Sequence, residues 1–381
     1  MRIGIDVTSA LTQGGGIGRY TRELVHALAL TEFNSSFDIH LFSARTKAPS
    51  PVPNPLPNHP QMVHRPARLS EKWLYRLWYR LKLPLPVQTF TGPIDLYHSP
   101  DFVLPPISGE TPTLLTIHDL SFIHYPETFT PQLIRFLNRV VPESVGKASH
   151  ILADSIATQR DLIELWQVPD EKITVLYSGV NETFRPITDK VALKRAREKY
   201  NLGQAPYVLT LGTVQPRKNY RMLIEAFAPI AKTHDHNLII VGGKGWLFEE
   251  ILNEVKVQGL EGRVIFTGFV DDIDLPTIYS AATLFAFPSI YEGFGLPILE
   301  SMACGVPVIN SNASCLPEVA GKATIQLDPT DQNAWTEALE MLLKDPVQRA
   351  QMVAEGYIQA QHFSWKKSAQ QLLEVYSQLL L

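Results

Sequence analysis

The chain has 381 residues, of which 45% are hydrophobic and 19% charged, and its formal net charge is −4. This length favours two or three domains with substantial cores, and the charge excludes a whole-protein attraction to nucleic acid. The two cysteines, Cys304 and Cys315, form neither a disulfide framework nor a metal-binding spacing. No signal-peptide pattern opens the chain, and no apolar run approaches the roughly 20 residues of a membrane span. We therefore expect a soluble, cytoplasmic protein.

The first half alternates short apolar runs with helical patterns. The runs that predict strands cover residues 2–7, 38–44, 95–100, 113–120, 148–155 and 171–180. A glycine loop at 14–20 opens a predicted helix that continues to residue 30, and another helix is predicted over 157–166. Residues 50–60 hold too many prolines for a regular element and predict an extended surface loop.

The second half shows the same alternation more clearly. Its predicted strands cover 207–213, 237–243, 263–268, 283–289 and 306–310, and its predicted helices cover 219–232, 246–258, 273–280 and 297–304. Strands that are apolar on both faces and alternate with helices indicate a parallel sheet covered on both sides. Residues 181–189 break the pattern and predict an interdomain linker, and 363–381 predict an amphipathic helix.

The chain is thus expected to be an α/β protein of two doubly wound domains. Ligands of such sheets bind beyond the carboxyl ends of the strands. We therefore expect the site in a cleft between the two domains.

The stretch "YEGFGLPILE" (291–300) carries two glutamates, one at each end of an apolar and glycine-rich run. Pro297 suits the first position of a helix, and Gly305 suits its C-terminal cap. Glu300 is then expected in the first turn, where the helix dipole would favour it by roughly 0.3–1 kcal/mol. Glu292 lies in the preceding loop and has no comparable structural reason.

The glycines beside Glu292 suggest what it binds. Gly293 and Gly295 let backbone N–H groups approach an anion closely. A carboxylate beside an anion site is unfavourable unless it faces hydroxyl groups. A ligand that carries both phosphate and hydroxyl groups, such as a nucleotide sugar, resolves this conflict.

Two cations are predicted at the same edge of the second sheet. Arg217 and Lys218 follow a predicted strand and precede a predicted helix. A pyrophosphate would use the arginine as a fork and the lysine as a point charge. The alternative is a solvated basic pair at a loop tip.

His118 ends a predicted strand of the first half, where it could donate a hydrogen bond to a sugar hydroxyl or to a developing charge. The alternatives are a capping or core histidine, and Asp119 beside it could be only a turn residue. Residues 71–82 mix aromatic side chains with arginine and lysine. They could contact a membrane surface or a lipid-linked acceptor, or form a packed helix with its charges outward.

The block "YEGFGLPILESMACGVPVI" resembles the Glu-x7-Glu signature of retaining glycosyltransferase family 4. "GGGIGRYTREL", "TIHDLSF", "SGVNETFRP" and "GTVQPRKN" match further blocks in the same order, most like bacterial mannosyltransferase-type members. The resemblance implies a GT-B fold, in which two Rossmann-like domains face each other across a cleft. Residues 1–183 would form the acceptor-side domain, 184–363 the nucleotide-sugar domain, and helix 364–381 would return to the first.

The resemblance also implies an activity. A hexose, with mannose favoured, would pass from GDP-mannose or a UDP-sugar to a glycan or lipid-linked acceptor, with retention of configuration. The leaving phosphate would accept the proton in a front-face mechanism, and neither a metal nor a cofactor would be needed. The enzyme is expected in the cytoplasm, and the inner face of the membrane is an alternative location.

Individual roles follow from the matched motifs. The residues implied to be catalytic are His118, Arg217, Lys218 and Glu292. Those implied to bind the donor are Gly15, Gly16, Gly212, Thr213, Phe269, Val270, Gly293, Phe294, Gly295, Leu296 and Glu300, and those on the acceptor side are Asp119 and Tyr20. Several family members have an arginine where this chain has Thr213, which would place more of the diphosphate contact on Arg217 and Lys218.

Three other activities remain compatible with the sequence. A glycoside hydrolase also uses paired carboxylates but acts without a nucleotide. A nucleotide-sugar epimerase or a non-catalytic sugar-nucleotide-binding protein would have the same fold.

Overall fold

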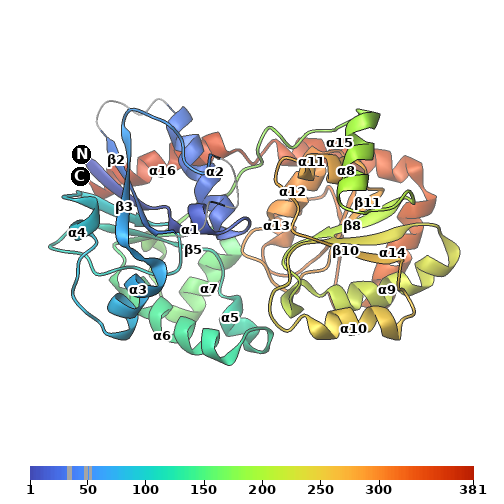
Figure 1. The fold of residues 1–381 in the computed structure, drawn as a ribbon, viewed down its shortest axis with the longest axis horizontal. Helices are drawn as coiled ribbons and strands as arrows, with labels where there is room; N and C mark the ends of the chain where they lie inside the picture. The colour runs from blue at the N-terminus through green and yellow to red at the C-terminus, as the bar shows by residue number, and fades with distance from the viewer. Residues whose placement is uncertain (32–36, 47–49, 51–53) are drawn as a thin grey trace. The chain divides into compact units, whose positions relative to one another are not determined.

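The computed structural model describes residues 1–31, 37–46, 50 and 54–381 (Figure 1). Contacts divide the chain into two compact units, which are described separately. Unit 1 comprises Met1–Leu120, Gln132–Gly179 and Ser364–Leu381, and unit 2 comprises Ser121–Pro131 and Val180–Phe363. The division after Gly179 lies close to the predicted boundary at 183/184, but the sequence does not predict that 121–131 joins the second unit.

Unit 1 contains a seven-stranded parallel sheet with the order β3-β2-β1-β4-β5-β6-β7. Its strands are β1 (Arg2–Asp6), β2 (Asp38–Arg45), β3 (Met62–Ser70), β4 (Leu96–Ser99), β5 (Thr113–Ile117), β6 (His150–Ala153) and β7 (Ile173–Val175). The order reverses between β1 and β4, which is the switch point of a doubly wound fold. The edge strand β3 was not predicted, because most of its residues are exposed and it lacks an apolar run.

The elements that surround this sheet are mostly helices. They are α1 (Thr8–Thr12), α2 (Ile17–Leu30), α3 (Glu71–Tyr75), the π-helical turn η1 (Arg76–Arg80), α4 (Gln88–Thr91), α6 (Pro131–Lys147), α7 (Ile156–Trp166), η3 (Asp170–Lys172) and α16 (Trp365–Leu379). Of the predicted proline-rich loop, residues 51–53 lie outside the described residues, and 54–60 form neither a helix nor a strand.

The C-terminal helix α16 packs onto unit 1, as predicted, and lies against α2 (Figure 1). The Ser368 hydroxyl donates to the carbonyl of Tyr177 at 2.5 Å. The buried Tyr376 hydroxyl lies 2.8 Å from Nδ1 of His98 on β4. Side chains of α16 thus tie the end of the chain to β4 and to the segment that follows β7.

Unit 2 contains a six-stranded parallel sheet with the order β10-β9-β8-β11-β12-β13. Its strands are β8 (Tyr207–Leu211), β9 (Asn237–Val241), β10 (Val264–Gly268), β11 (Leu284–Phe287), β12 (Val308–Ser311) and β13 (Ile325–Leu327). The strands β9, β11 and β12 are buried along their whole length. Burial on both faces of the sheet therefore explains the continuous apolar runs in the sequence, as expected. The switch point of this sheet lies between β8 and β11.

Unit 2 also contains short and long helices. They are α5 (Ser121–His124), η2 (Pro126–Thr128), α8 (Lys190–Lys199), η4 (Pro216–Lys218), α9 (Tyr220–Thr233), α10 (Glu249–Val257), α11 (Leu275–Ser280), α12 (Leu296–Ala303), α13 (Leu316–Ala320), α14 (Gln332–Lys344) and α15 (Pro346–Ala360). Within the described ranges, none of the helices of either unit combines the length and the apolar character needed to cross a membrane.

Aromatic contacts explain why 121–131 belongs to unit 2. The imidazole of His124 stacks on Tyr291 with ring centroids 5.2 Å apart. The indole N–H of Trp246 donates to the carbonyl of Thr128 at 2.5 Å, and its ring lies 5.6 Å from that of Phe129. The segment that directly follows β5 is therefore fixed to the loop that carries Glu292.

The start of α16 depends on the absence of a side chain at Gly179. A Cβ there would lie 2.0 Å from the backbone nitrogen of Trp365. We expect Gly179→Ala to lower the free energy of unfolding by about 1–3 kcal/mol, because the backbone itself must move. Gly146→Ala in α6, where a Cβ meets nothing within 4 Å, should instead raise it by about 0.5–1 kcal/mol. Urea denaturation followed by tryptophan fluorescence checks both values, and equal midpoints for the two variants would contradict this packing.

Candidate functional site

Three predicted residues meet beyond the switch point of unit 2. Arg217 and Lys218 lie in η4 after β8, and Glu292 lies in the loop after the neighbouring strand β11. Lys218 Nζ donates to Glu292 Oε1 at 2.5 Å, and Arg217 Nη1 donates to Glu292 Oε2 at 3.0 Å. Neighbouring parallel strands therefore bring together residues that are 74 and 75 positions apart.

These three charged side chains are largely buried, with exposed fractions of 13% for Arg217, 11% for Lys218 and 10% for Glu292. Burial raises the pKa of Glu292, but the charges of Arg217 and Lys218 outweigh burial and lower this pKa to about 2. Glu292 is therefore ionised at neutral pH, so it cannot be the protonated general acid of a glycoside hydrolase. Two cations around one carboxylate leave a net positive charge at this place.

Backbone contacts fix the two loops against each other. The N–H of Ile290 donates to the carbonyl of Arg217 at 3.0 Å, and Arg217 Nη1 donates to the carbonyl of Tyr291 at 2.5 Å. The side chain of Asn219 donates to the carbonyl of Pro288 at 3.2 Å. These hydrogen bonds thus hold the loop that carries the two cations against the loop that carries the glutamate.

Two residues that the sequence did not mark form hydrogen bonds with the loop that carries Glu292. Ser314 Oγ accepts the N–H of Glu292 at 2.9 Å. The buried thiol of Cys315 lies 3.1 Å from the carbonyls of both Glu292 and Phe294. Both come from the turn before α13, and the sequence holds no signal of a contact across this distance.

Two of the predicted donor-binding glycines are required by the local structure. Gly295 has φ +104°, and a Cβ there would lie 2.8 Å from Leu316. Gly212 has φ +150°, and a Cβ there would lie 3.0 Å from both Lys218 Cε and the Tyr220 hydroxyl. Their contact with a donor stays a prediction.

The other predicted donor-side residues of unit 2 differ in exposure. Thr213 is exposed after β8, and Phe269 after β10 is 50% exposed, whereas Val270 beside it is buried. Leu296 begins α12 and is half-buried. The ring of Phe294 packs into the unit, 5.6 Å from the ring of Phe363. Gly293 is buried between Glu292 and Phe294.

Glu300 does not lie in the first turn of its helix, so that prediction is wrong. The helix α12 starts at Leu296 with Gly295 as its N-cap, which makes Glu300 its fifth residue. Its side chain is buried, and Oε2 accepts the Tyr279 hydroxyl at 2.9 Å. The helix ends as predicted, with Gly305 at φ +76° just beyond it.

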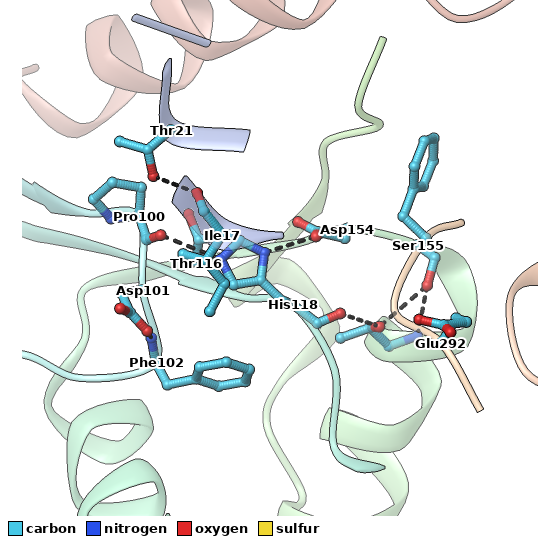
Figure 2. Close-up of polar contacts among 12 residues, drawn as sticks. Ile17, Thr21, Pro100, Asp101, Phe102, Thr116, His118, Asp154, Ser155 and Glu292 are labelled. Carbon is cyan, nitrogen blue, oxygen red and sulfur yellow. Dashed lines mark hydrogen bonds and ion pairs between the residues drawn. The ribbon is translucent and has the colours of Figure 1, made fainter. Parts of the chain in front are cut away.

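In unit 1, His118 is a buried ion-pair partner (Figure 2). Its Nδ1 lies 2.7 Å from Oδ2 of Asp154, and its Nε2 lies 3.2 Å from the carbonyl oxygen of Pro100. Burial lowers the pKa of His118, but the charge and hydrogen bond of Asp154, together with the charge of Asp101, raise it to about 9. The imidazole is thus a cation at neutral pH. The sequence missed Asp154, although it ends a predicted strand in the same way as His118.

Tyr20 and Asp119 occupy different surroundings. Tyr20 is buried, and its ring meets His118 and Trp365 edge-on at centroid distances of 4.9 and 5.8 Å. It therefore serves as a packing partner of His118, and Asp119 is half-buried beside it in the chain. An acceptor contact of either residue stays a prediction.

The glycine loop of unit 1 is held by hydrogen bonds from a side chain of the helix that follows it. Arg22 on α2, which the sequence did not single out, is buried and donates to the carbonyl of Gly14 at 2.7 Å and of Gln13 at 2.5 Å. Gly16 has φ +53° at the N-cap of α2. A Cβ at Gly15 or Gly16 would meet nothing within 4 Å, so the loop surface beside both glycines is open.

Comparison with known proteins identifies the family. Residues 14–184 match the family described as Glycosyltransferase Family 4, and residues 194–359 match Glycosyl transferases group 1. The chain is 33% identical over 377 residues to O-antigen chain mannosyltransferase B of Escherichia coli, with 96% of each chain covered. The chain belongs to glycosyltransferase family 4. This glycosyltransferase is therefore a hexosyltransferase, and the epimerase and non-catalytic alternatives fall away.

Solved structures show the fold of this glycosyltransferase. Sucrose-phosphate synthase from Thermosynechococcus elongatus aligns with a TM-score of 0.77 at 23% identity, covering 100% of this chain and 99% of the other. HepE of Anabaena, solved in complex with UDP and glucose, aligns with a TM-score of 0.70 at 20% identity, covering 99% of each chain. The predicted GT-B fold is confirmed. Among the described residues, no group of three or more His, Cys, Asp and Glu side chains could hold a metal ion.

Removing the charge of Glu292 tests the buried triad. Glu292→Gln leaves Arg217 and Lys218 without a counter-charge, so we expect it to lower the free energy of unfolding at pH 7 by about 3–5 kcal/mol. The pKa of Glu292 in the fold is about 2, below its ordinary value of 4.5. The stabilisation is therefore complete above about pH 5 and declines as the pH falls toward 2. Urea denaturation at pH 7 and pH 4 should show the gap between wild type and variant narrowing at pH 4.

The matched control is Glu225→Gln. This carboxylate pairs with Arg221 at 3.2 Å, and that arginine is 59% exposed. Exposed pairs of this kind contribute about 0–1 kcal/mol, so this variant should stay close to wild type at both pH values. If Glu292→Gln had the same free energy of unfolding as wild type, the three charged side chains would not form an interacting unit.

Proposed function

We propose that this glycosyltransferase moves a hexose, with mannose favoured, from a nucleotide-diphosphate sugar to a saccharide or lipid-linked acceptor with retention of configuration. The name of the Escherichia coli relative, a mannosyltransferase of the O-antigen chain, supports mannose and hence GDP-mannose as the donor. HepE was solved with UDP, which supports a UDP-sugar as the second choice.

The contact that carries this proposal is the clamp of Arg217 and Lys218 on the two oxygens of Glu292. Both cations already bind a two-oxygen anion in a buried place. A diphosphate offers oxygens of the same kind with more charge, so it would replace the carboxylate. The released carboxylate, still buried, would then need new hydrogen-bond donors, and the hydroxyl groups of the donor sugar would supply them.

This exchange leads to a mechanism. The bond between the anomeric carbon and the β-phosphate oxygen breaks, and its electron pair leaves with the phosphate. The acceptor oxygen attacks the anomeric carbon from the same face, and its proton passes to the departing phosphate oxygen. Arg217 and Lys218 stabilise the charge that builds on this phosphate. We propose that no metal ion or cofactor is required, because these two fixed cations supply the positive charge.

Glu300 is proposed to bind the ribose of the donor. It is buried, and it already accepts a hydroxyl group, that of Tyr279 at 2.9 Å. An ionised carboxylate can accept several hydrogen bonds, so a ribose hydroxyl would add to the tyrosine. The half-exposed ring of Phe269 would lie near the base of the nucleotide.

A membrane contact is proposed for residues 71–82 of unit 1, together with the neighbouring Leu83. In α3 and η1 the side chains of Leu74 and Trp78 point inward and are buried. Exposed apolar side chains follow along the same segment: Trp73, Tyr75, Leu81 and Leu83. Four basic residues alternate with them: Lys72, Arg76, Arg80 and Lys82. Exposed apolar groups among cations suit an anionic lipid surface, where a lipid-linked acceptor would be found.

A donor screen tests the catalytic proposal. GDP-mannose should raise the thermal stability of the protein more than UDP-sugars do, because the ligand that binds more tightly stabilises the fold more. At a hundredfold excess over its Kd, a ligand adds about 2.7 kcal/mol to the free energy of unfolding. Transfer of radiolabelled mannose to a mannose-terminated oligosaccharide should then fall about 100-fold in Lys218→Ala, which removes one donor to the leaving phosphate. Lys232→Ala, an exposed lysine at the end of α9, is the control. Failure of every nucleotide sugar to stabilise the protein, or wild-type turnover in Lys218→Ala, would refute the proposal.

Vesicle sedimentation tests the membrane contact. The protein should bind vesicles of phosphatidylcholine with about 30% phosphatidylglycerol, and less at high salt, because exposed charges are screened. The double variant Trp73→Ser/Leu81→Ser should bind at least about tenfold more weakly, since each lost apolar side chain contributes roughly 1.5–3 kcal/mol when buried. The double variant Ile273→Ser/Val347→Ser removes apolar side chains of unit 2 that are 86% and 77% exposed. Equal loss in both variants would contradict a specific surface.

A further inference from the structure

The carboxylate of Asp154 stands at the carboxyl end of β6, beside the end of β5 that carries His118. One of its oxygens, Oδ2, lies 2.7 Å from Nδ1 of His118 in a pair whose side chains are less than one tenth exposed. The other oxygen, Oδ1, is buried without a hydrogen-bond partner. The carboxylate therefore directs its one bonded oxygen at the imidazole.

The turn from β6 to α7, which carries Asp154, also binds the backbone of His118 (Figure 2). Ser155 caps α7, since its Oγ accepts the N–H of Thr158 at 3.1 Å. The hydroxyl of Thr158 donates to the carbonyl of His118 at 3.1 Å. The turn from β6 to α7 thus fixes both the ring and the main chain of the histidine.

The second ring nitrogen of His118 is held less tightly. Its Nε2 lies 3.2 Å from the carbonyl oxygen of Pro100, at the long end of the range for an N–H···O bond. The bond to Asp154, at 2.7 Å, is short and charge-assisted. Of the two N–H groups, the one on Nε2 is therefore the one that a ligand oxygen can take over.

The charge of the imidazole depends on its acidic neighbours. The titratable groups around it, on β4, β6, α2 and the adjoining loops, are His98, Asp101, Asp119, Asp154 and Tyr20. Burial lowers the pKa of His98 to about 3 and raises that of Tyr20, so both are neutral at pH 7. Burial would also lower the pKa of His118, and the carboxylates, Asp154 first, reverse this effect.

We infer that Asp154 is a positioning residue for transfer, which keeps His118 charged and its Nε2–H available for an oxygen of the substrate. This role rests on the proposed function, the transfer of a hexose, and on the predicted role of His118, which is to donate a hydrogen bond to a sugar hydroxyl or to developing charge. A carboxylate with a merely structural role would stabilise the fold without setting the proton on the histidine.

The test compares Asp154→Asn with wild type across pH. The amide keeps the shape of the side chain but removes the charge, so burial then lowers the pKa of His118. Wild type should keep its kcat up to about pH 8 and lose it only as His118 deprotonates near pH 9. Asp154→Asn should show a kcat about tenfold to a hundredfold lower at pH 7.5, which recovers as the pH is lowered below 6.5, with little change in the KM of the donor.

Two further variants separate positioning from folding. Asp154→Glu retains the charge and should restore the wild-type pH profile in part. Glu254→Gln removes a different buried carboxylate, which pairs with Arg221 at 3.1 Å in unit 2. It should alter stability and leave the pH profile unchanged.

A readout independent of activity completes the test. NMR spectra of protein with ¹⁵N-labelled histidines, assigned with His118→Gln, report the protonation of His118 directly. We expect a doubly protonated ring at pH 7.5 in wild type and a neutral ring in Asp154→Asn. A neutral His118 in wild type, or an unchanged pH profile in Asp154→Asn, would overturn the role of Asp154. Absence of transfer from every nucleotide sugar would instead overturn the proposed function.

Discussion

The carboxylate of Glu292 joins the two loops on which the candidate donor site of unit 2 is built. Each loop leaves the sheet at a strand next to the switch point, one after β8 and one after β11. A buried cation or carboxylate is tolerated only when it is paired, so the triad with Arg217 and Lys218 fixes the distance between the loops. The bonds from Ser314 and Cys315 to the glutamate loop then hold the carboxylate in place.

Unit 1 follows the same constraint with different residues. Its sheet is also parallel and doubly wound, and its buried ion pair again joins the ends of neighbouring strands, β5 and β6. The interior of such a sheet is apolar on both faces, so a charged side chain finds room only where the chain leaves the sheet. Both units therefore place a buried cluster of paired charges at strand ends, and in both the pairing of charges sets which groups are ionised.

The sequence predicts this architecture where burial leaves a pattern. The strands β8, β9, β11 and β12 of unit 2 could be predicted because they are almost wholly buried. The strands β3 and β13 were not predicted: β3 is mostly exposed and carries no apolar run, and β13 has three residues, none of them fully buried. The helix α6 was not predicted, although it continues through Pro142 just as the predicted helix α9 continues through Pro229. The place of 121–131 in unit 2 could not be predicted, since it depends on aromatic contacts such as that of His124 with Tyr291, more than 150 positions away in the chain.

The same distinction holds for the site. Topology places Arg217, Lys218 and Glu292 at one edge, so the sequence could predict their common location, but it could not show that they bind one another. The pairing of these three side chains determines which ligand groups the site would accept. Because the cations and the carboxylate already satisfy each other, a phosphate alone would leave Glu292 buried without donors, and a sugar alone would leave the cations with nothing new to bind. Under the proposed function, only a ligand that carries phosphate and hydroxyl groups together satisfies all three side chains, which would make the triad selective for an intact nucleotide sugar.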